Sequence, residues 1–168
     1  MNALALTLLA LHGLVISIDE VHHRQRGLPR WERIGHPMDT ASVLACYLVA
    51  LLFEPARTTL VAYAVLAAFS CLLITKDEFV HARRCEPTEH WLHALLFVLH
   101  PLILIAAALL WLAGERLVLS IAALSTALFG LYQSVYWNWF AAPDARRRLG
   151  THGEPTTARS PQDSRSPT

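Results

Sequence analysis

The sequence has few charged residues and few cysteines. Charged side chains make up only 16% of its 168 residues, whereas 54% of the residues are hydrophobic. This composition excludes an ordinary soluble domain, in which about a quarter of the residues are charged. The net charge of +1 gives no sign of a nucleic-acid partner, and none is expected. The three cysteines have no metal-type spacing, and their odd number argues against a disulfide framework.

Uncharged segments long enough to cross a bilayer recur along the chain. Residues 58–75 and 117–140 contain no charged side chain, and residues 91–113 contain only two histidines. Residues 3–18 and 40–53 are shorter, and we expect each to gain length from the polar segment beside it. The first segment lacks a basic beginning and a small-residue cleavage site, so it is interpreted as a retained helix. The sequence therefore predicts an all-α, polytopic integral membrane protein with five transmembrane helices.

The positive charges are divided unevenly between the two sides of such a protein. With five spans, the segments after the first, third and fifth helices share one side. That side holds twelve Lys and Arg residues, against only Arg57 and Arg116 on the other. Because cytoplasmic segments are enriched in Lys and Arg, we expect the N-terminus outside and the C-terminus in the cytoplasm. The prediction is a multi-pass protein of a bacterial-type inner (plasma) membrane, in contact with its lipids.

Two domains of unequal character are expected. Residues 1–140 form the transmembrane domain, and residues 141–168, rich in Pro, Arg, Ser and Thr, form a disordered cytoplasmic tail. Inside the domain, the halves at about 1–54 and 58–113 are a weak internal repeat of one helical hairpin. Two such hairpins predict a four-helix bundle, with the fifth helix, 117–140, packed outside it.

The repeat carries acidic residues and histidines at matching positions. Because an α-helix turns by about 100° per residue, side chains three or four positions apart share a face. A carboxylate and an imidazole one turn apart can therefore bind one metal ion, and two such pairs on facing helices can bind two. Both ligand pairs should lie on the cytoplasmic side. The expected ligands are Glu20, His23, Glu32, His36, Glu78, His81, Glu89 and His93.

Further acidic residues and histidines surround these ligands. Eight of the thirteen acids and eight of the nine histidines lie in or beside the repeated segments. Nitrogen and oxygen ligands without paired thiolates suit iron, manganese or zinc, and we expect two ions, iron first. In the alternative, metal-free interpretation, neighbouring arginines neutralise the acids in an interfacial ion-pair cluster. Possible additional ligands, or residues that orient the ligands, are His12, Asp19, Asp39, Asp77, Glu86, His90 and His100.

The paired Glu-x-x-His motifs resemble the ligand set of a known class of metalloproteins. Glu20-x-x-His23 and Glu78-x-x-His81, with Glu32 and Glu86 or Glu89, are similar to the ligands of carboxylate-bridged di-iron proteins. The membrane-associated quinone hydroxylases and the alternative oxidases are examples. The many cytoplasmic histidines also resemble integral-membrane desaturases and hydroxylases, although the His-x-x-His-His boxes of those enzymes are absent. The resemblance implies oxygen chemistry at a di-iron centre.

These patterns predict a membrane-embedded di-metal oxidase, hydroxylase or desaturase. Its substrate would be lipid-like or otherwise apolar, it would act at the cytoplasmic face, and a redox partner would supply electrons. Two alternatives stay open: a zinc-dependent membrane hydrolase that activates water, and a non-enzymatic membrane protein that binds metal or, through His12 and His100, haem. Arg24 and Arg26 are expected to face solvent or headgroups, and Trp91, Trp137 and Trp139 to form an aromatic belt.

Overall fold

The computed structural model describes residues 2–78 and 87–141, and every element in these residues is helical. Five long α-helices dominate, and a 3₁₀ turn (η1) follows the third and a π-helical turn (η2) the last. Each of the five is long and apolar enough to cross a membrane, which confirms the all-α prediction and the number of such helices. The elements are α1 Asn2–Arg26, α2 Arg30–Leu52, α3 Arg57–Leu73, η1 Ile74–Asp77, α5 Pro87–Leu112, α6 Arg116–Val135 and η2 Tyr136–Phe140.

Some predicted features lie outside the described residues. These are the expected ligands His81 and Glu86 and almost all of the predicted tail, residues 142–168. Asp77 ends η1, but its side chain is not among those described. The second Glu-x-x-His pair is therefore placed only through Glu78.

The first two helices extend into the polar segments, as expected. α1 continues through its acids and histidines to Arg26 and ends at Gly27, whose φ of +80° is a backbone conformation that glycine adopts without strain. α2 begins directly after Pro29 and runs through Pro37 without interruption. Both polar segments are thus helical, and their carboxylates and imidazoles project from defined helix faces.

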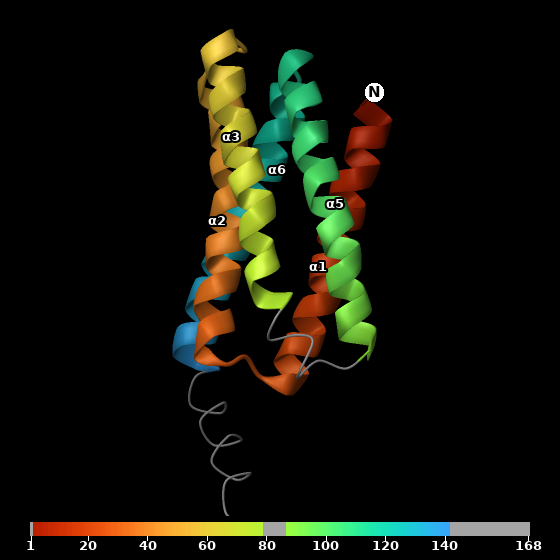
Figure 1. The fold of residues 1–168 in the computed structure, drawn as a ribbon, viewed down its shortest axis with the longest axis vertical. Helices are drawn as coiled ribbons and strands as arrows, with labels where there is room; N and C mark the ends of the chain where they lie inside the picture. The colour runs from red at the N-terminus through yellow and green to blue at the C-terminus, as the bar shows by residue number, and fades with distance from the viewer. Residues whose placement is uncertain (1, 79–86, 142–168) are drawn as a thin grey trace, which may run out of the picture.

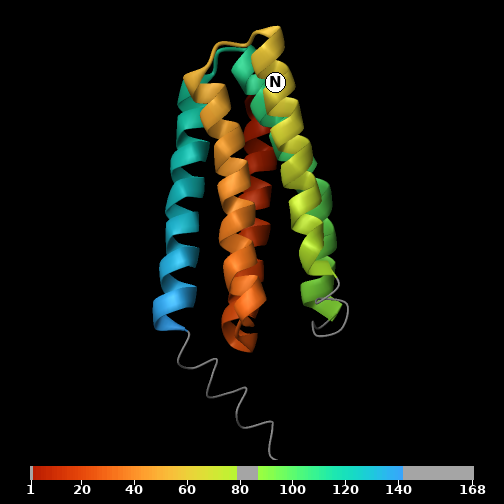
Figure 2. The ribbon, with the colours of Figure 1, turned by 60° about the vertical axis from the view of Figure 1, so that its left-hand side comes forward.

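The five helices run side by side, alternately up and down (Figure 1). The turn at 27–29, η1, the start of α5 and η2 meet at the lower end in Figure 1, here called the charged end. The N-terminus and the links at 53–56 and 113–115 lie at the opposite end, where Figure 2 shows both links together. The Lys and Arg residues described at the charged end are Arg24, Arg26, Arg30, Arg33 and Lys76.

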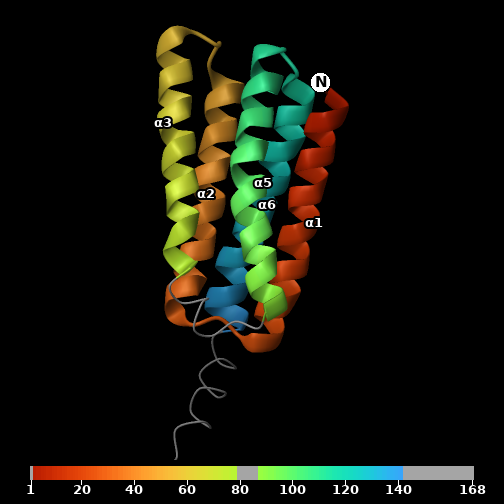
Figure 3. The same cartoon turned by 45° about the vertical axis from the view of Figure 1, so that its right-hand side comes forward.

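The helices pair differently from the predicted hairpins. α1 packs chiefly on α5, while α2 packs on α6 and α3. α1 and α2 follow each other in the chain but separate beyond their turn (Figure 3). α6 lies closely against α2 instead of outside a bundle of four helices, and a Cβ added at Gly130 would stand only 3.1 Å from Thr40 Cγ2. The expected division into two repeated hairpins and a fifth outer helix is not confirmed.

Apolar side chains are divided between a core and the outer surface. The main core cluster joins all five long helices, α1 through Ala5, and includes the fully buried Cys46 and Ala107. Many large apolar side chains point outward instead, among them Leu52, Leu72 and Leu117, each more than 70% exposed. An outer surface of this kind is unusual in a soluble monomer and is compatible with a membrane protein.

Candidate metal centre and its cavity

Four buried side chains from α1 and α5 meet at the charged end. One ligand atom from each lies within 4.8 Å of the others, and the residues are Asp19, His23, Glu89 and His93. His93 Nε2 lies 3.1 Å from Asp19 Oδ1, and His23 Nε2 lies 3.4 Å from Glu89 Oε1. On each helix the carboxylate and the histidine are four residues apart, which is one turn. This four-residue group could hold a metal ion.

A second group shares one residue with the first. His23 of α1 also lies with Glu32 and His36 of α2, again with one ligand atom from each within 4.8 Å of the others. The ring centroids of His23 and His36 are 4.7 Å apart. Glu32 is fully buried and His36 is half-buried. His23 therefore joins a four-residue and a three-residue group, so that three helices contribute to one region.

Arg26 lies between the carboxylates of the two groups. Its Nη2 atom is 2.8 Å from Glu32 Oε2 and 2.9 Å from Glu89 Oε1, and its Nε donates a second hydrogen bond to Glu89 at 3.2 Å. The prediction that Arg26 faces solvent or headgroups is wrong, because these two buried acids draw it inward. Buried charges need a partner of opposite sign or a metal. Arg26 supplies one such partner and is the basis of the metal-free interpretation.

Glu20 faces away from both groups and contacts α6. Its Oε1 atom accepts hydrogen bonds from the Tyr132 hydroxyl and, at 3.1 Å, from Trp137 Nε1. Arg24 donates a 2.9 Å hydrogen bond to the same Tyr132 hydroxyl. One residue is about 100° of helix rotation, so that Asp19 and Glu20 necessarily point to different neighbours. Asp19 occupies the position expected for Glu20.

The remaining predicted ligands are spread over three places. Glu78 pairs with His90 at 3.6 Å near the surface, where both side chains are more than a third exposed, and neither belongs to the two groups. Asp39 lies 2.6 Å from Lys76 Nζ, which neutralises its charge. His12 and His100 lie deeper in the bundle, with ring centroids 6.1 Å apart.

A chain of hydroxyl groups runs from His100 toward α2. His100 Nε2 is 2.9 Å from Ser70 Oγ, which is 2.6 Å from Ser42 Oγ, and Ser42 donates to the Asp39 carbonyl at 2.7 Å. His100, Ser70 and Ser42 are buried. His100 is therefore a hydrogen-bonded histidine that ties α5 to α3 and α2.

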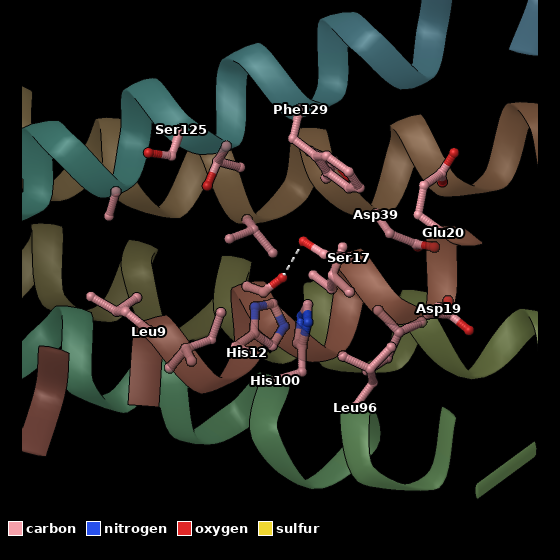
Figure 4. Close-up of a pocket in the computed structure, with 18 of the residues that line it drawn as sticks. Leu9, His12, Ser17, Asp19, Glu20, Asp39, Leu96, His100, Ser125 and Phe129 are labelled. Atoms are coloured by element: carbon pink, nitrogen blue, oxygen red, sulfur yellow. Dashed lines mark hydrogen bonds between the residues drawn. The ribbon is translucent and has the colours of Figure 1, made fainter. Parts of the chain in front are cut away.

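The groups lie at one end of a cavity of about 490 Å³. In Figure 4, Asp19, Glu20 and Asp39 lie at this end, Leu9 and Ser125 lie at the other, and His12 and His100 stand side by side between them. The volume falls within the usual range of small-molecule sites, roughly 300–1,000 Å³. The body of the cavity is mainly apolar, with polar side chains such as Ser17, Thr126 and Gln133 among its lining. Its apolar walls include Leu6, Leu9, Ile16, Leu96, Phe97, Ile103, Val118, Ile121 and Phe129.

The sequence alone did not place Tyr132 and Trp137 in this region, and it indicated Arg26 only as one of several arginines that could neutralise the acids. Trp137 is only 2% exposed and is a partner of Glu20, not part of an aromatic belt. Tyr132 and Trp137 are five residues apart, which an ideal α-helix would rotate to well-separated faces. The π-helical turn from Tyr136 to Phe140 widens the helix at this point, and both side chains reach Glu20. No spacing rule for an α-helix would have found this pair.

Most of the expected ligands are nevertheless brought together. His23, Glu32, His36, Glu89 and His93 all belong to the two groups, and Asp19 completes the first. This buried cluster of nitrogen and oxygen ligand atoms could hold a metal ion. Comparison of the chain with protein-family models, with curated proteins and with solved structures found no match.

Proposed function

We propose that this chain is an integral-membrane metalloenzyme that uses two metal ions, in the first place iron, to oxidise, hydroxylate or desaturate a lipid-like or other apolar substrate. The single observation that carries the proposal is the buried pair of acid and histidine groups at one end of an apolar cavity. A metal centre beside an apolar chamber is the arrangement that oxygen chemistry on an unactivated carbon chain requires. Ligands from helices in a bundle core are the usual way to build such a centre.

The residues divide into two ligand sets. Asp19, His23, Glu89 and His93 would hold one ion, and Glu32 and His36 would contribute to the second, with His23 serving both only as an imidazolate that has lost its ring proton. Bound iron would supply the redox chemistry that reduces dioxygen. In a hydroxylation, a substrate C–H bond becomes C–OH, the other oxygen atom leaves as water, and an external electron-transfer partner supplies two electrons with two protons.

Arg26 has a place in this proposal. Glu32 and Glu89 would each lie close to a metal ion. The Arg26 guanidinium contacts both of these carboxylates. A cation in contact with ligating carboxylates fixes their orientation, as residues that hydrogen-bond metal ligands commonly do. The metal-free alternative assigns the same contacts to charge neutralisation alone.

The proposed membrane orientation places the charged end in the cytoplasm. The described cations at this end are Arg24, Arg26, Arg30, Arg33 and Lys76, while only Arg57 and Arg116 lie at the opposite end of the described residues. This distribution supports insertion with the N-terminus outside. The metal centre would then lie near the cytoplasmic boundary of a bacterial-type inner membrane.

The proposal is tested by metal analysis and absorption spectroscopy of protein purified in detergent. We expect about two irons per chain, with near-ultraviolet bands of an iron centre, in protein expressed with added iron. The His23→Ala variant should lose both irons, because His23 belongs to both groups, and Glu32→Gln should lose about one. His22→Ala is the matched control, since His22 is the adjacent histidine outside both groups, and it should keep the full content.

Other results would contradict the proposal in distinct ways. Zinc without visible absorption would favour the membrane hydrolase, and a sharp Soret band lost in His12→Ala would favour haem held by His12 and His100. Absence of bound metal even after reconstitution, with a well-folded protein, would favour the ion-pair cluster centred on Arg26.

A further inference from the structure

The cavity opens between α1 and α6. Several residues that line it are also exposed on the outside of the bundle: Leu6 is 49% and Ile121 is 58% exposed, and Gly13, Ser17 and Ser125 are exposed as well. The backbones of α1 and α6 make few close approaches, in contrast to α1 with α5 and α2 with α6. The lining therefore continues from the interior to the outer surface along this side.

Gly13 marks the open position on α1. A Cβ added at this glycine would meet nothing within 4 Å, so the space next to it is empty. Gly13 is one residue from His12, whose ring lies inside the cavity (Figure 4). At Gly130, by comparison, an added Cβ would press on Thr40. The two glycines thus serve different purposes, one leaving an opening and one allowing close packing.

The opening is closed toward the charged end. There the hydrogen bonds of Tyr132 and Trp137 to Glu20 join α6 to α1, and the Arg24 guanidinium stacks over the Tyr136 ring at 4.7 Å. The exposed lining residues lie further along both helices, within the parts apolar enough to cross a membrane. In the proposed membrane location, an opening at this depth leads to lipid and not to water.

Several polar side chains line the cavity beside its apolar walls, and those of Ser17, Thr40 and His100 hydrogen-bond within the protein. Among the described residues, His12 makes a ring contact with His100 and no hydrogen bond, so its imidazole is free to bond a ligand in the cavity. A polar side chain at membrane depth is costly unless it meets a partner. Most of the surrounding side chains are leucine, isoleucine, valine, alanine and phenylalanine, which favour an alkyl or isoprenoid chain.

We infer that the cavity takes its ligand laterally from the bilayer, through the opening beside Gly13, and that this ligand is an elongated uncharged molecule with an alkyl or isoprenoid chain and one hydrogen-bonding oxygen. His12 bonds the oxygen, and the chain occupies the apolar body of the cavity. This inference deepens the proposed function, because it names the substrate class and its route, and it rests on the proposed membrane location.

The inference is tested with metal-free protein in lipid vesicles. The probe is a long-chain alcohol that carries a photoreactive diazirine in its chain, used with and without excess unlabelled alcohol. We expect saturable labelling of peptides around residues 10–17 and 121–125. Gly13→Phe should reduce it by about tenfold, the effect of losing roughly 1.4 kcal/mol of binding free energy. His12→Phe should remove the preference for the alcohol over an alkane probe of equal length.

Matched variants distinguish a blocked opening from a misfolded protein. Leu14→Phe places the same ring one residue further along α1, where Leu14 is 57% exposed and does not line the cavity, and it should label like the wild type. Ser125→Phe narrows the opening from α6 and should act like Gly13→Phe. Metal content measured on Gly13→Phe should equal that of the wild type, so that a failure of the metal proposal is recognised separately.

Two results would overturn the inference. One is equal labelling of the wild type and of both blocking variants. The other is equally strong labelling of the same peptides by a charged, water-soluble diazirine probe added outside the vesicles, which would show a route from water.

Discussion

Asp19 and Glu20 are adjacent in the sequence, but we expect Asp19 to bind metal and Glu20 to stabilise the contact between α1 and α6. Conservative substitutions distinguish these two roles. Asp19→Asn removes a carboxylate from the four-residue group and should lower metal affinity by at least about tenfold. Glu20→Gln should leave the metal content unchanged, because Glu20 contacts α6. It should instead lower the free energy of unfolding by about 1–2 kcal/mol, since Glu20 accepts hydrogen bonds from Tyr132 and Trp137.

Metal titration and thermal unfolding in detergent measure these two effects. An Asp19→Asn protein that keeps wild-type metal affinity would remove Asp19 from the ligand set. A Glu20→Gln protein that loses metal would restore the ligand role that the Glu-x-x-His motif suggested for it.

The sequence could predict which residue types gather, but not every residue that joins them. His23, Glu32, His36, Glu89 and His93 lie at one end of adjoining helices, so that spacing alone placed them near one another. The choice between Asp19 and Glu20 depends on which face of α1 meets α5. Local spacing does not contain this information. The inward position of Arg26 depends on two acids from other helices in the same way.

The contact between α2 and α6 depends on the small size of Gly130. An added Cβ would lie 3.1 Å from Thr40 Cγ2, and Thr40 donates a 2.6 Å hydrogen bond to Gln133 on α6. Gly130→Leu should therefore force the helices apart and lower the free energy of unfolding by about 1–3 kcal/mol. Circular dichroism during heating in detergent measures the loss. Gly13→Leu, at the open glycine, is the control and should unfold like the wild type or later, and equal stability of both variants would contradict this account.

The helices themselves were predictable, but their pairing was not. Long uncharged runs and the polar segments beside them indicated all five helices, and the structure extends them as expected. Pairing depends on which face of each helix is buried. In a helix that is apolar all round, the hydrophobic pattern does not mark that face, because lipid and protein interiors are equally apolar. The packing of α1 on α5 and of α6 on α2 could therefore be read only from the structure.

The orientation proposed for the whole molecule rests on its charged end, and single cysteines test it. Ala56→Cys lies in the link at the opposite end, and Arg30→Cys lies at the charged end. Both positions are exposed. In a chain whose native cysteines are replaced by alanine, a membrane-impermeant maleimide should label Ala56→Cys in intact cells. It should label Arg30→Cys only after the membrane is permeabilised, because the proposal places the charged end in the cytoplasm. The reverse pattern would contradict the proposed orientation.

The pairing of α1 with α5 has a consequence for biosynthesis. Asp19 and His23 emerge from the ribosome well before Glu89 and His93, and α1 makes its main helix contacts only with α5. In the proposed membrane location, α1 resides in the bilayer without α5 while α2 and α3 are inserted. The four-residue group is completed late, and a metal ion that arrives before α5 would find only Asp19 and His23.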